Sequence, residues 1–200
     1  MTGRAPLIVL ASSSPRRREI LSSLGLSFTV RPSEVPETLR RGEDPFDGAE
    51  RLAREKGEAA AATAPSGSLV IAADTLVVID GKALGKPRSR RDAARMLRLL
   101  RGRRHDVVTG LALVVGGRVA AGRETSGVFL ARMSEREIRA YVASGEPDDK
   151  AGAYALQGLG GLFVERVEGS PSNVIGLPVT LLYRLAARLG LDVLTRAKGR

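Results

Sequence analysis

The chain has 200 residues, 43% of them hydrophobic and 27% charged, proportions that are typical of a globular protein and exclude a disordered one. It contains no cysteine, which excludes both a disulfide framework and a thiolate metal site. The formal net charge is +10, but apart from residues 88–104 the basic residues are spread along the chain. Aromatic residues that could stack on bases make up only 4%, so we do not expect nucleic acid to be a partner.

The length suits one domain spanning residues 1–200, with a frayed tail over residues 191–200. No uncharged apolar stretch approaches the roughly 18 residues that a membrane span needs. We therefore expect a cytoplasmic protein with no membrane partner.

The N-terminal part alternates strand and helix patterns. The apolar run 7–10 predicts a strand buried on both faces. Ser14 suits a helix N-cap and Pro15 the first helical position, and Ile20, Leu21 and Leu24 form the apolar stripe of that helix. A second strand is expected over residues 27–30.

The middle of the chain continues the alternation. Asp44 and Pro45 begin a helix, residues 69–73 form a second buried strand that ends at Asp74, and residues 76–84 form a hairpin around Asp80-Gly81. The remaining expected elements are a helix over 89–100, a hairpin over 105–129, a helix over 134–143, a strand over 162–167, a loop holding Pro171 and Asn173, and a helix over 179–189. Together they predict an α/β fold with a mixed, twisted sheet.

The turn after the first strand is a candidate anion site. A strand, a serine-rich turn and a helix N-terminus present backbone N–H donors, to which Ser12 and Ser14 add hydroxyls. Arg16 and Arg17 add guanidinium groups that can bind phosphate in a bidentate manner. The alternative is ordinary helix capping with surface arginines. The turn contains neither a dinucleotide-binding nor a P-loop motif.

Two charged residues further on could serve the same chemistry. Asp74 stands where an apolar strand is expected to end, and a carboxylate there can bind a hard cation or activate water. The alternative is a helix or turn cap. Lys86 could place a positive charge near Asp74, although a lone loop lysine is usually solvated.

The segment 145–158 packs carboxylates, Lys150 and Gln157 into a glycine-rich loop, which favours a functional loop over a structural one. The only histidine, His105, has no partners at catalytic or metal-binding spacing, so we expect it to be structural.

Six segments in this order resemble the Maf family and span nearly the whole chain. They are residues 10–21, 51–56, 73–75, 85–87, 146–158 and 173–178. The resemblance implies a single two-lobed domain with a central cleft, related to inosine triphosphate pyrophosphatases, and a homodimer. It implies a house-cleaning enzyme that converts a nucleoside triphosphate and water into the monophosphate and pyrophosphate, with a divalent cation, Mg²⁺ or Mn²⁺.

The resemblance also implies roles for individual residues. Asp74 would accept the proton of the attacking water, and Glu37 and Asp74 would hold the metal. The implied substrate-binding residues are Ser12, Arg16, Lys56, Thr75, Lys86 and Gln157.

Three of these positions separate the subgroups of the family. Arg16, Thr75 and Gln157 are similar to the subgroup that prefers dTTP and UTP, whereas the subgroup that prefers 7-methyl-GTP tends to carry Trp, Gln and Glu there. Two alternatives stay open: a pyrophosphatase for a modified purine nucleotide such as 7-methyl-GTP, and a septum-formation regulator that acts by binding.

Overall fold

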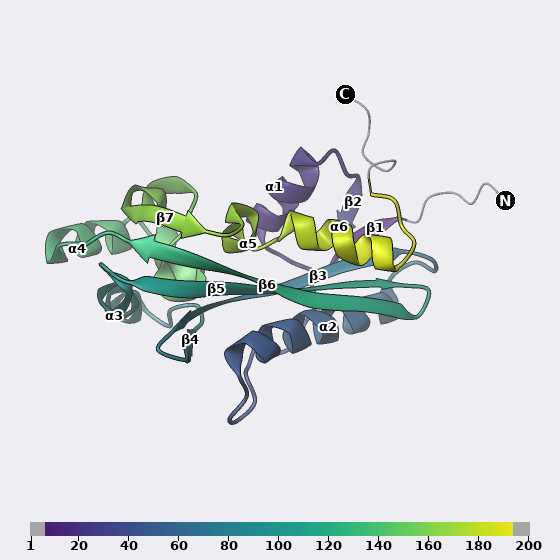
Figure 1. Ribbon diagram of the computed structural model, residues 1–200, viewed down its shortest axis with the longest axis horizontal. Helices are drawn as coiled ribbons and strands as arrows, with labels where there is room; N and C mark the ends of the chain where they lie inside the picture. The colour runs from purple at the N-terminus through teal and green to yellow at the C-terminus, as the bar shows by residue number, and fades with distance from the viewer. Residues whose placement is uncertain (1–6, 194–200) are drawn as a thin grey trace. The chain divides into compact units, whose positions relative to one another are not determined.

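The structure is a computed structural model, which describes residues 7–193 as α-helices around a mixed seven-stranded sheet (Figure 1). The strands are β1 (Ile8–Leu10), β2 (Phe28–Val30), β3 (Leu69–Ile79), β4 (Lys82–Leu84), β5 (Arg104–Val115), β6 (Arg118–Leu130) and β7 (Val164–Glu168). The α-helices are α1 (Pro15–Ser23), α2 (Pro45–Thr63), α3 (Arg90–Leu100), α4 (Glu135–Ala143), α5 (Pro171–Ile175) and α6 (Val179–Arg188). The strand order is β2-β1-β3-β5-β6-β7, with β4 paired to β3, so the expected α/β class with a mixed sheet is confirmed.

The chain divides into two compact units. Unit 1 contains the described residues 7–74, 109–124 and 176–193, and unit 2 contains residues 75–108 and 125–175. Strands β3, β5 and β6 each contribute residues to both units.

Unit 1 has helices on both faces of its strands, with α2 on one face and α1 and α6 on the other (Figure 1). The two faces follow from the alternation of side chains along a strand. On β3, Val70 and Ala72 pack with Ala60 of α2, whereas Ile71 and Ala73 pack with Leu21 of α1. Even-numbered residues of β3 in this unit therefore point toward α2.

Unit 2 has its own core between α3, α4 and its strands. Helix α3 buries its apolar stripe there, and α4 buries Ile138, Tyr141 and Val142 against it. His105 is buried in this unit, where its Nε2 atom lies 2.7 Å from the hydroxyl of Tyr154. His105 thus has the structural environment that the sequence predicts.

Most helix starts lie where local sequence predicts them. Asp44 accepts hydrogen bonds from the backbone N–H groups of Phe46 and Asp47, and Ser134 and Glu137 form a reciprocal capping box. At Asp80-Gly81 both residues have positive φ, 50° and 70°, as a tight hairpin turn requires.

Several predicted elements are wrong. Strand β3 continues through Asp74 and Thr75 to Ile79, whereas the sequence predicts an end at Asp74. The loop predicted around Asn173 is helix α5, and β7 begins at Val164 because a 3₁₀ segment, Gly158–Phe163, occupies the first part of the predicted strand.

The predicted frayed tail is only partly described. Leu191 and Val193 are partly buried against the core of unit 1, and residues 194–200 lie outside the described range. Between residues 7 and 193 no helix combines the length and the apolar character needed to cross a membrane.

Candidate active site

A buried lysine joins two carboxylates in unit 1. The Nζ atom of Lys56 donates to Oδ1 of Asp74 at 2.5 Å and to Oε1 of Glu37 at 2.7 Å. The side chains of Lys56 and Asp74 are only 5% and 6% exposed, whereas that of Glu37 is 48% exposed. The arrangement is a charged centre closed by protein on one side and open to solvent at Glu37.

The sequence places Lys56 and Asp74 together through two periodicities. Lys56 occupies the buried stripe of α2 with Leu52, Ala53 and Ala60, so it points into the sheet. Asp74 is an even-numbered residue of β3 and points toward α2. The helix lies so close to β5 that a Cβ atom on Gly110 would come within 2.0 Å of the Ala49 carbonyl oxygen.

The serine-rich turn is organised by Arg17. Its Nη1 atom donates to Oγ of Ser12 at 3.0 Å, and its Nε atom donates to the carbonyl oxygen of Gly176 at 2.8 Å. The Ser12 hydroxyl also accepts the backbone N–H of Ser14 at 3.2 Å, whereas the Ser14 side chain makes no capping bond. The predicted N-cap position is right, but no side chain caps the helix there, and the Ser12 hydroxyl instead bonds the N–H of the N-cap residue itself.

Arg17 belongs electrostatically to the same centre as Lys56. Desolvation by burial lowers the pKa of the Arg17 guanidinium, and the carboxylates of Asp74 and Glu37 act in the opposite direction. Arg16 is partly exposed at the second position of α1 and lies within electrostatic range of Arg17. Of the site residues implied by the resemblance, unit 1 brings together Glu37, Lys56 and Asp74, with Arg17 linking Ser12 to them, while Arg16 lies next to Arg17 in the chain.

The other predicted site residues belong to unit 2. Thr75 follows Asp74 on β3 and is partly buried, and Lys86 and Gln157 are exposed. Lys86 follows Gly85, whose carbonyl oxygen accepts the backbone N–H of Gly152 at 3.1 Å, so its loop is attached to the segment 145–158.

Glu146 in that segment has a structural task. Its carboxylate accepts from the Tyr141 hydroxyl at 2.9 Å and from the backbone N–H groups of Leu159 and Gly160 at 2.9 and 2.8 Å. Desolvation raises the pKa of Glu146, but these hydrogen bonds outweigh it and the net pKa is lowered. The sequence predicts that the charged residues of this loop are functional. Glu146, however, has a structural role, because it holds the turn that follows Gln157.

Metal binding by protein groups alone is not preorganised in the described residues. Between residues 7 and 193 no three histidine, aspartate or glutamate side chains gather closely enough to hold an ion. Glu37 and Asp74 are a pair of carboxylates joined by Lys56.

A family model described as Maf-like protein matches residues 7–189. The chain belongs to the Maf family. Relatives of this Maf chain extend over almost its full length. A dTTP/UTP pyrophosphatase of Anaeromyxobacter dehalogenans (strain 2CP-C) is 51% identical and covers 94% of this chain and 97% of its own length. One from Syntrophomonas wolfei is 45% identical, covering 92% and 98%.

A third relative has a broader name. The nucleoside triphosphate pyrophosphatase of a Synechococcus species is 44% identical and covers 94% of this Maf chain and 96% of its own length. Among solved structures, the Staphylococcus aureus Ham1 protein matches with a TM-score of 0.50 and 18% identity, covering 92% and 98%. This last likeness concerns the fold alone.

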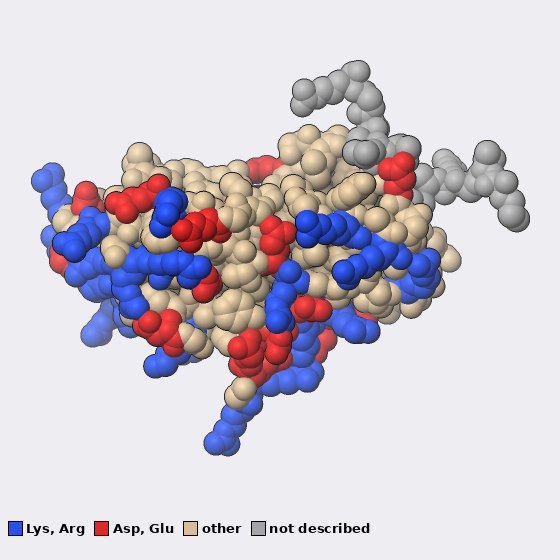
Figure 2. Space-filling view, viewed as in Figure 1, with Lys and Arg blue, Asp and Glu red and all other residues tan. Residues whose placement is uncertain are grey.

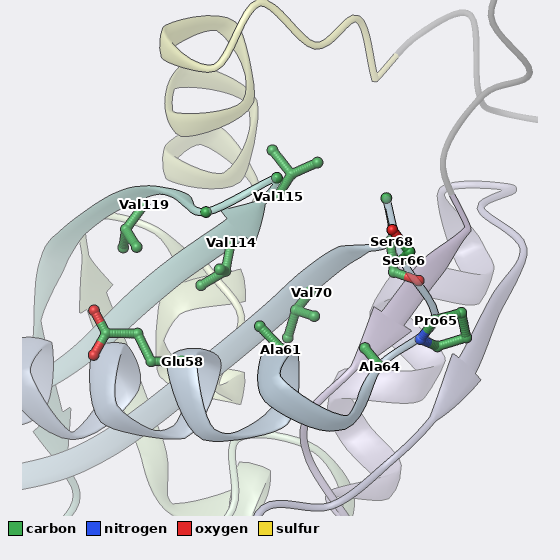
Figure 3. Close-up of a pocket in the computed structure, with 13 residues that line it drawn as sticks. Glu58, Ala61, Ala64, Pro65, Ser66, Ser68, Val70, Val114, Val115 and Val119 are labelled. Atoms are coloured by element: carbon green, nitrogen blue, oxygen red, sulfur yellow. The ribbon is translucent and has the colours of Figure 1, made fainter.

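One pocket of unit 1 does not suit a triphosphate. It measures about 390 Å³ and lies between the end of α2 and the turn that joins β5 to β6 (Figure 3). Its wall mixes alanine and valine side chains with serines, glycines and a proline, its lining holds no lysine or arginine, and Glu58 stands at one end. A polyanion would meet a carboxylate and no cationic side chain there, so we do not assign this pocket to the substrate of a Maf protein.

Arg17 is a candidate for the anion site in the sequence, but the site residues implied by the resemblance include Arg16 and leave Arg17 out. A signal was present. Arg17 precedes the buried Leu21 by four residues, so both lie on the same face of α1. Arg18, one position on, is exposed.

Proposed function

We propose that this Maf chain hydrolyses dTTP and UTP, and modified pyrimidine triphosphates of the same shape, to the monophosphate and pyrophosphate. The support is the set of near-full-length relatives named dTTP/UTP pyrophosphatase. The observation that carries the proposal is the buried lysine between two carboxylates, beside an arginine that orders a serine-rich turn. A centre of this kind combines a base with groups that neutralise phosphate charge.

The proposed reaction forms one bond and breaks one. The oxygen of water attacks the α-phosphorus, the bond from that phosphorus to the oxygen bridging the α- and β-phosphates breaks, and pyrophosphate leaves with the electron pair. Asp74 accepts the proton that the water loses. Lys56 holds the Asp74 carboxylate through a 2.5 Å hydrogen bond, which fixes the orientation of the base.

The remaining roles concern charge. Ser12, Arg16, Lys56 and Lys86 bind or neutralise the polyphosphate. Arg17 is a positioning residue, because it holds the Ser12 hydroxyl and the Gly176 carbonyl in place. The roles of Thr75, Lys86 and Gln157 rest on the resemblance to the family.

We also propose a divalent cation, Mg²⁺ or Mn²⁺, with Glu37 and Asp74 as its protein ligands. Mg²⁺ usually keeps several waters and binds through one or two carboxylates together with substrate phosphates. Two oxygen-bearing side chains joined at Lys56 fit that requirement. When bound, the ion would neutralise charge on the polyphosphate.

We assign substrate choice to Arg16, Thr75 and Gln157, whose combination is similar to that of the dTTP- and UTP-preferring subgroup. Three further proposals concern the domain organisation, the oligomeric state and the location of the protein. The family match over residues 7–189 supports one functional domain, the resemblance supports a homodimer, and a nucleotide substrate supports a cytoplasmic location.

A turnover panel tests the proposal. Purified protein with Mg²⁺ or Mn²⁺ is given dTTP, UTP, CTP and 7-methyl-GTP, and pyrophosphate is measured. We expect kcat/KM for dTTP and UTP to exceed the value for 7-methyl-GTP at least tenfold. A higher kcat/KM for 7-methyl-GTP would contradict the proposed substrate and favour a modified purine nucleotide. If no nucleotide of a broad panel released pyrophosphate, the proposed enzymatic activity itself would be wrong.

A further inference from the structure

The positive charge of the chain is divided unequally between the two units. The described part of unit 1 holds 13 basic and 12 acidic residues, a net charge of +1. Unit 2 holds 15 basic and 10 acidic residues, a net charge of +5. Within unit 2, residues 88–104 contain eight arginines and one aspartate. The excess charge is therefore local to α3 and the residues at its ends.

Helices α3 and α4 present this charge together. Arg91, Arg95 and Arg98 follow one another at helical spacing on the exposed side of α3, and Arg136 and Arg139 are exposed on α4. We call these five residues the arginine face. Arg98 donates to the Glu135 carboxylate at 2.8 Å, which attaches the exposed side of α3 to the start of α4. Figure 2 shows blue side chains gathered over the end of unit 2 where Figure 1 labels these helices.

Acidic neighbours leave much of the arginine face uncompensated. Arg95 pairs with Asp92 and Arg98 with Glu135. For Arg91, Arg136 and Arg139, no salt bridge to another residue of the range 7–193 is found. Exposed ion pairs are also weak and exchange readily, so a polyanion can compete with those that exist.

The chemistry of the face selects among polyanions. Every basic residue on it is arginine, whose planar fork matches two phosphate oxygens. The apolar side of α3, Ala93, Met96, Leu97 and Leu100, is buried in the core of unit 2. Because that side cannot enter a lipid layer, the helix lacks what a membrane-surface helix requires.

We propose that the arginine face binds the phosphate backbone of a nucleic-acid duplex. No aromatic side chain belongs to the face, and Tyr141 of α4 is buried, so unpaired bases find no side chain to stack on and a duplex suits the face better than a single strand. This differs from the expectation drawn from the sequence, which set nucleic acid aside because aromatic residues are few and the basic residues outside 88–104 are spread along the chain. The proposal does not depend on the pyrophosphatase activity.

The test is an anisotropy titration with labelled 20-base-pair duplexes of DNA and of RNA at 50 to 200 mM KCl. The test variant is Arg91→Glu/Arg136→Glu/Arg139→Glu, and the matched control is Arg41→Glu/Arg184→Glu/Arg188→Glu, which changes three exposed arginines of unit 1. We expect wild-type binding to weaken steeply with salt. The test variant should bind at least tenfold more weakly with a shallower salt slope, while the control stays within about threefold of wild type.

Thermal unfolding of all variants checks the fold, and Arg91→Gln/Arg136→Gln/Arg139→Gln replaces the test variant if charge reversal unfolds it. An equal loss of binding in test and control variants would overturn the proposal, because net charge would then be the cause. So would binding to phosphatidylglycerol vesicles without binding to either duplex. A parallel fall in kcat/KM for dTTP would show that the face steers nucleotide substrate instead.

Discussion

Arg17 and Arg18 are neighbours with different surroundings, and they form a matched pair for mutagenesis. Arg17 holds Ser12 and Gly176, whereas Arg18 is exposed. Lysine cannot reproduce the fork that reaches both partners. We expect Arg17→Lys to raise KM for dTTP at least tenfold and to leave kcat within about threefold of wild type. The reason is that the substitution disturbs the serine-rich turn that binds phosphate but leaves Asp74, the proposed base, in place. Steady-state kinetics should show Arg18→Lys unchanged; equal KM values for both variants would remove Arg17 from the site.

Lys56 stabilises the charged centre because it neutralises the carboxylates of Glu37 and Asp74. In Lys56→Met the buried Asp74 carboxylate loses its partner and faces Glu37, which should lower the free energy of unfolding by about 3 kcal/mol. Urea denaturation measures this, with Lys82→Met, a change at an exposed lysine, as the control. If Lys56→Met were as stable as wild type, the three groups would not be coupled in the folded protein.

At the scale of elements, Glu146 holds the segment 157–161 to α4. The substitution Glu146→Gln keeps the size of the side chain. The glutamine amide is uncharged and has one acceptor oxygen, so it cannot replace the carboxylate that accepts three hydrogen bonds. We expect a loss of about 1–3 kcal/mol in the free energy of unfolding, measured in urea. Glu165→Gln, at an exposed position of β7, is the control and should change stability by less than about 0.5 kcal/mol. Equal effects of the two variants would contradict the assigned role.

Elements whose signals are local could be predicted from the sequence. The capping box of Ser134 and Glu137 and the turn at Asp80-Gly81 need only neighbouring residues. Elements that depend on distant partners could not. Strand β3 passes through Asp74 because paired strands accompany it, and α5 is stabilised by the Asn173 side chain, which donates to the Val107 carbonyl and the Ser126 hydroxyl.

The same distinction applies to the site across the whole molecule. The segments of the family pattern identified Ser12, Lys56 and Asp74, and unit 1 brings them together. The hydrogen bonds of Lys56 to two carboxylates join residues 18 and 19 positions apart, so the periodicities of α2 and β3 indicate which way Lys56 and Asp74 point but do not specify that they pair. The positioning role of Arg17 could not be predicted, because its partner Gly176 lies 159 positions away in the sequence.

The pH dependence of folding is a property of the whole molecule to which His105 contributes. Burial lowers the pKa of His105 to about 4, against 6.5 for the free side chain. Between these pH values His105 binds a proton in the unfolded chain but not in the folded one. The free energy of unfolding therefore decreases as pH falls from about 6.5 toward 4, by up to about 3 kcal/mol. Urea denaturation at pH 7, 6 and 5 measures the slope. His105→Gln, which does not titrate, should show a shallower one; identical slopes would show that carboxylates alone are responsible.

Asp74 is the residue on which the proposed reaction depends. Pyrophosphate release from dTTP with Mg²⁺ is compared for wild type, Asp74→Asn and Asp80→Asn, where Asp80 is an exposed turn residue of unit 2. We predict that Asp74→Asn lowers kcat at least 100-fold, because a positioned base contributes about 10² to 10⁴ in rate, and that Asp80→Asn leaves it unchanged. An Asp74→Asn protein that folds and releases pyrophosphate at the wild-type rate would contradict the assignment of Asp74 as the base.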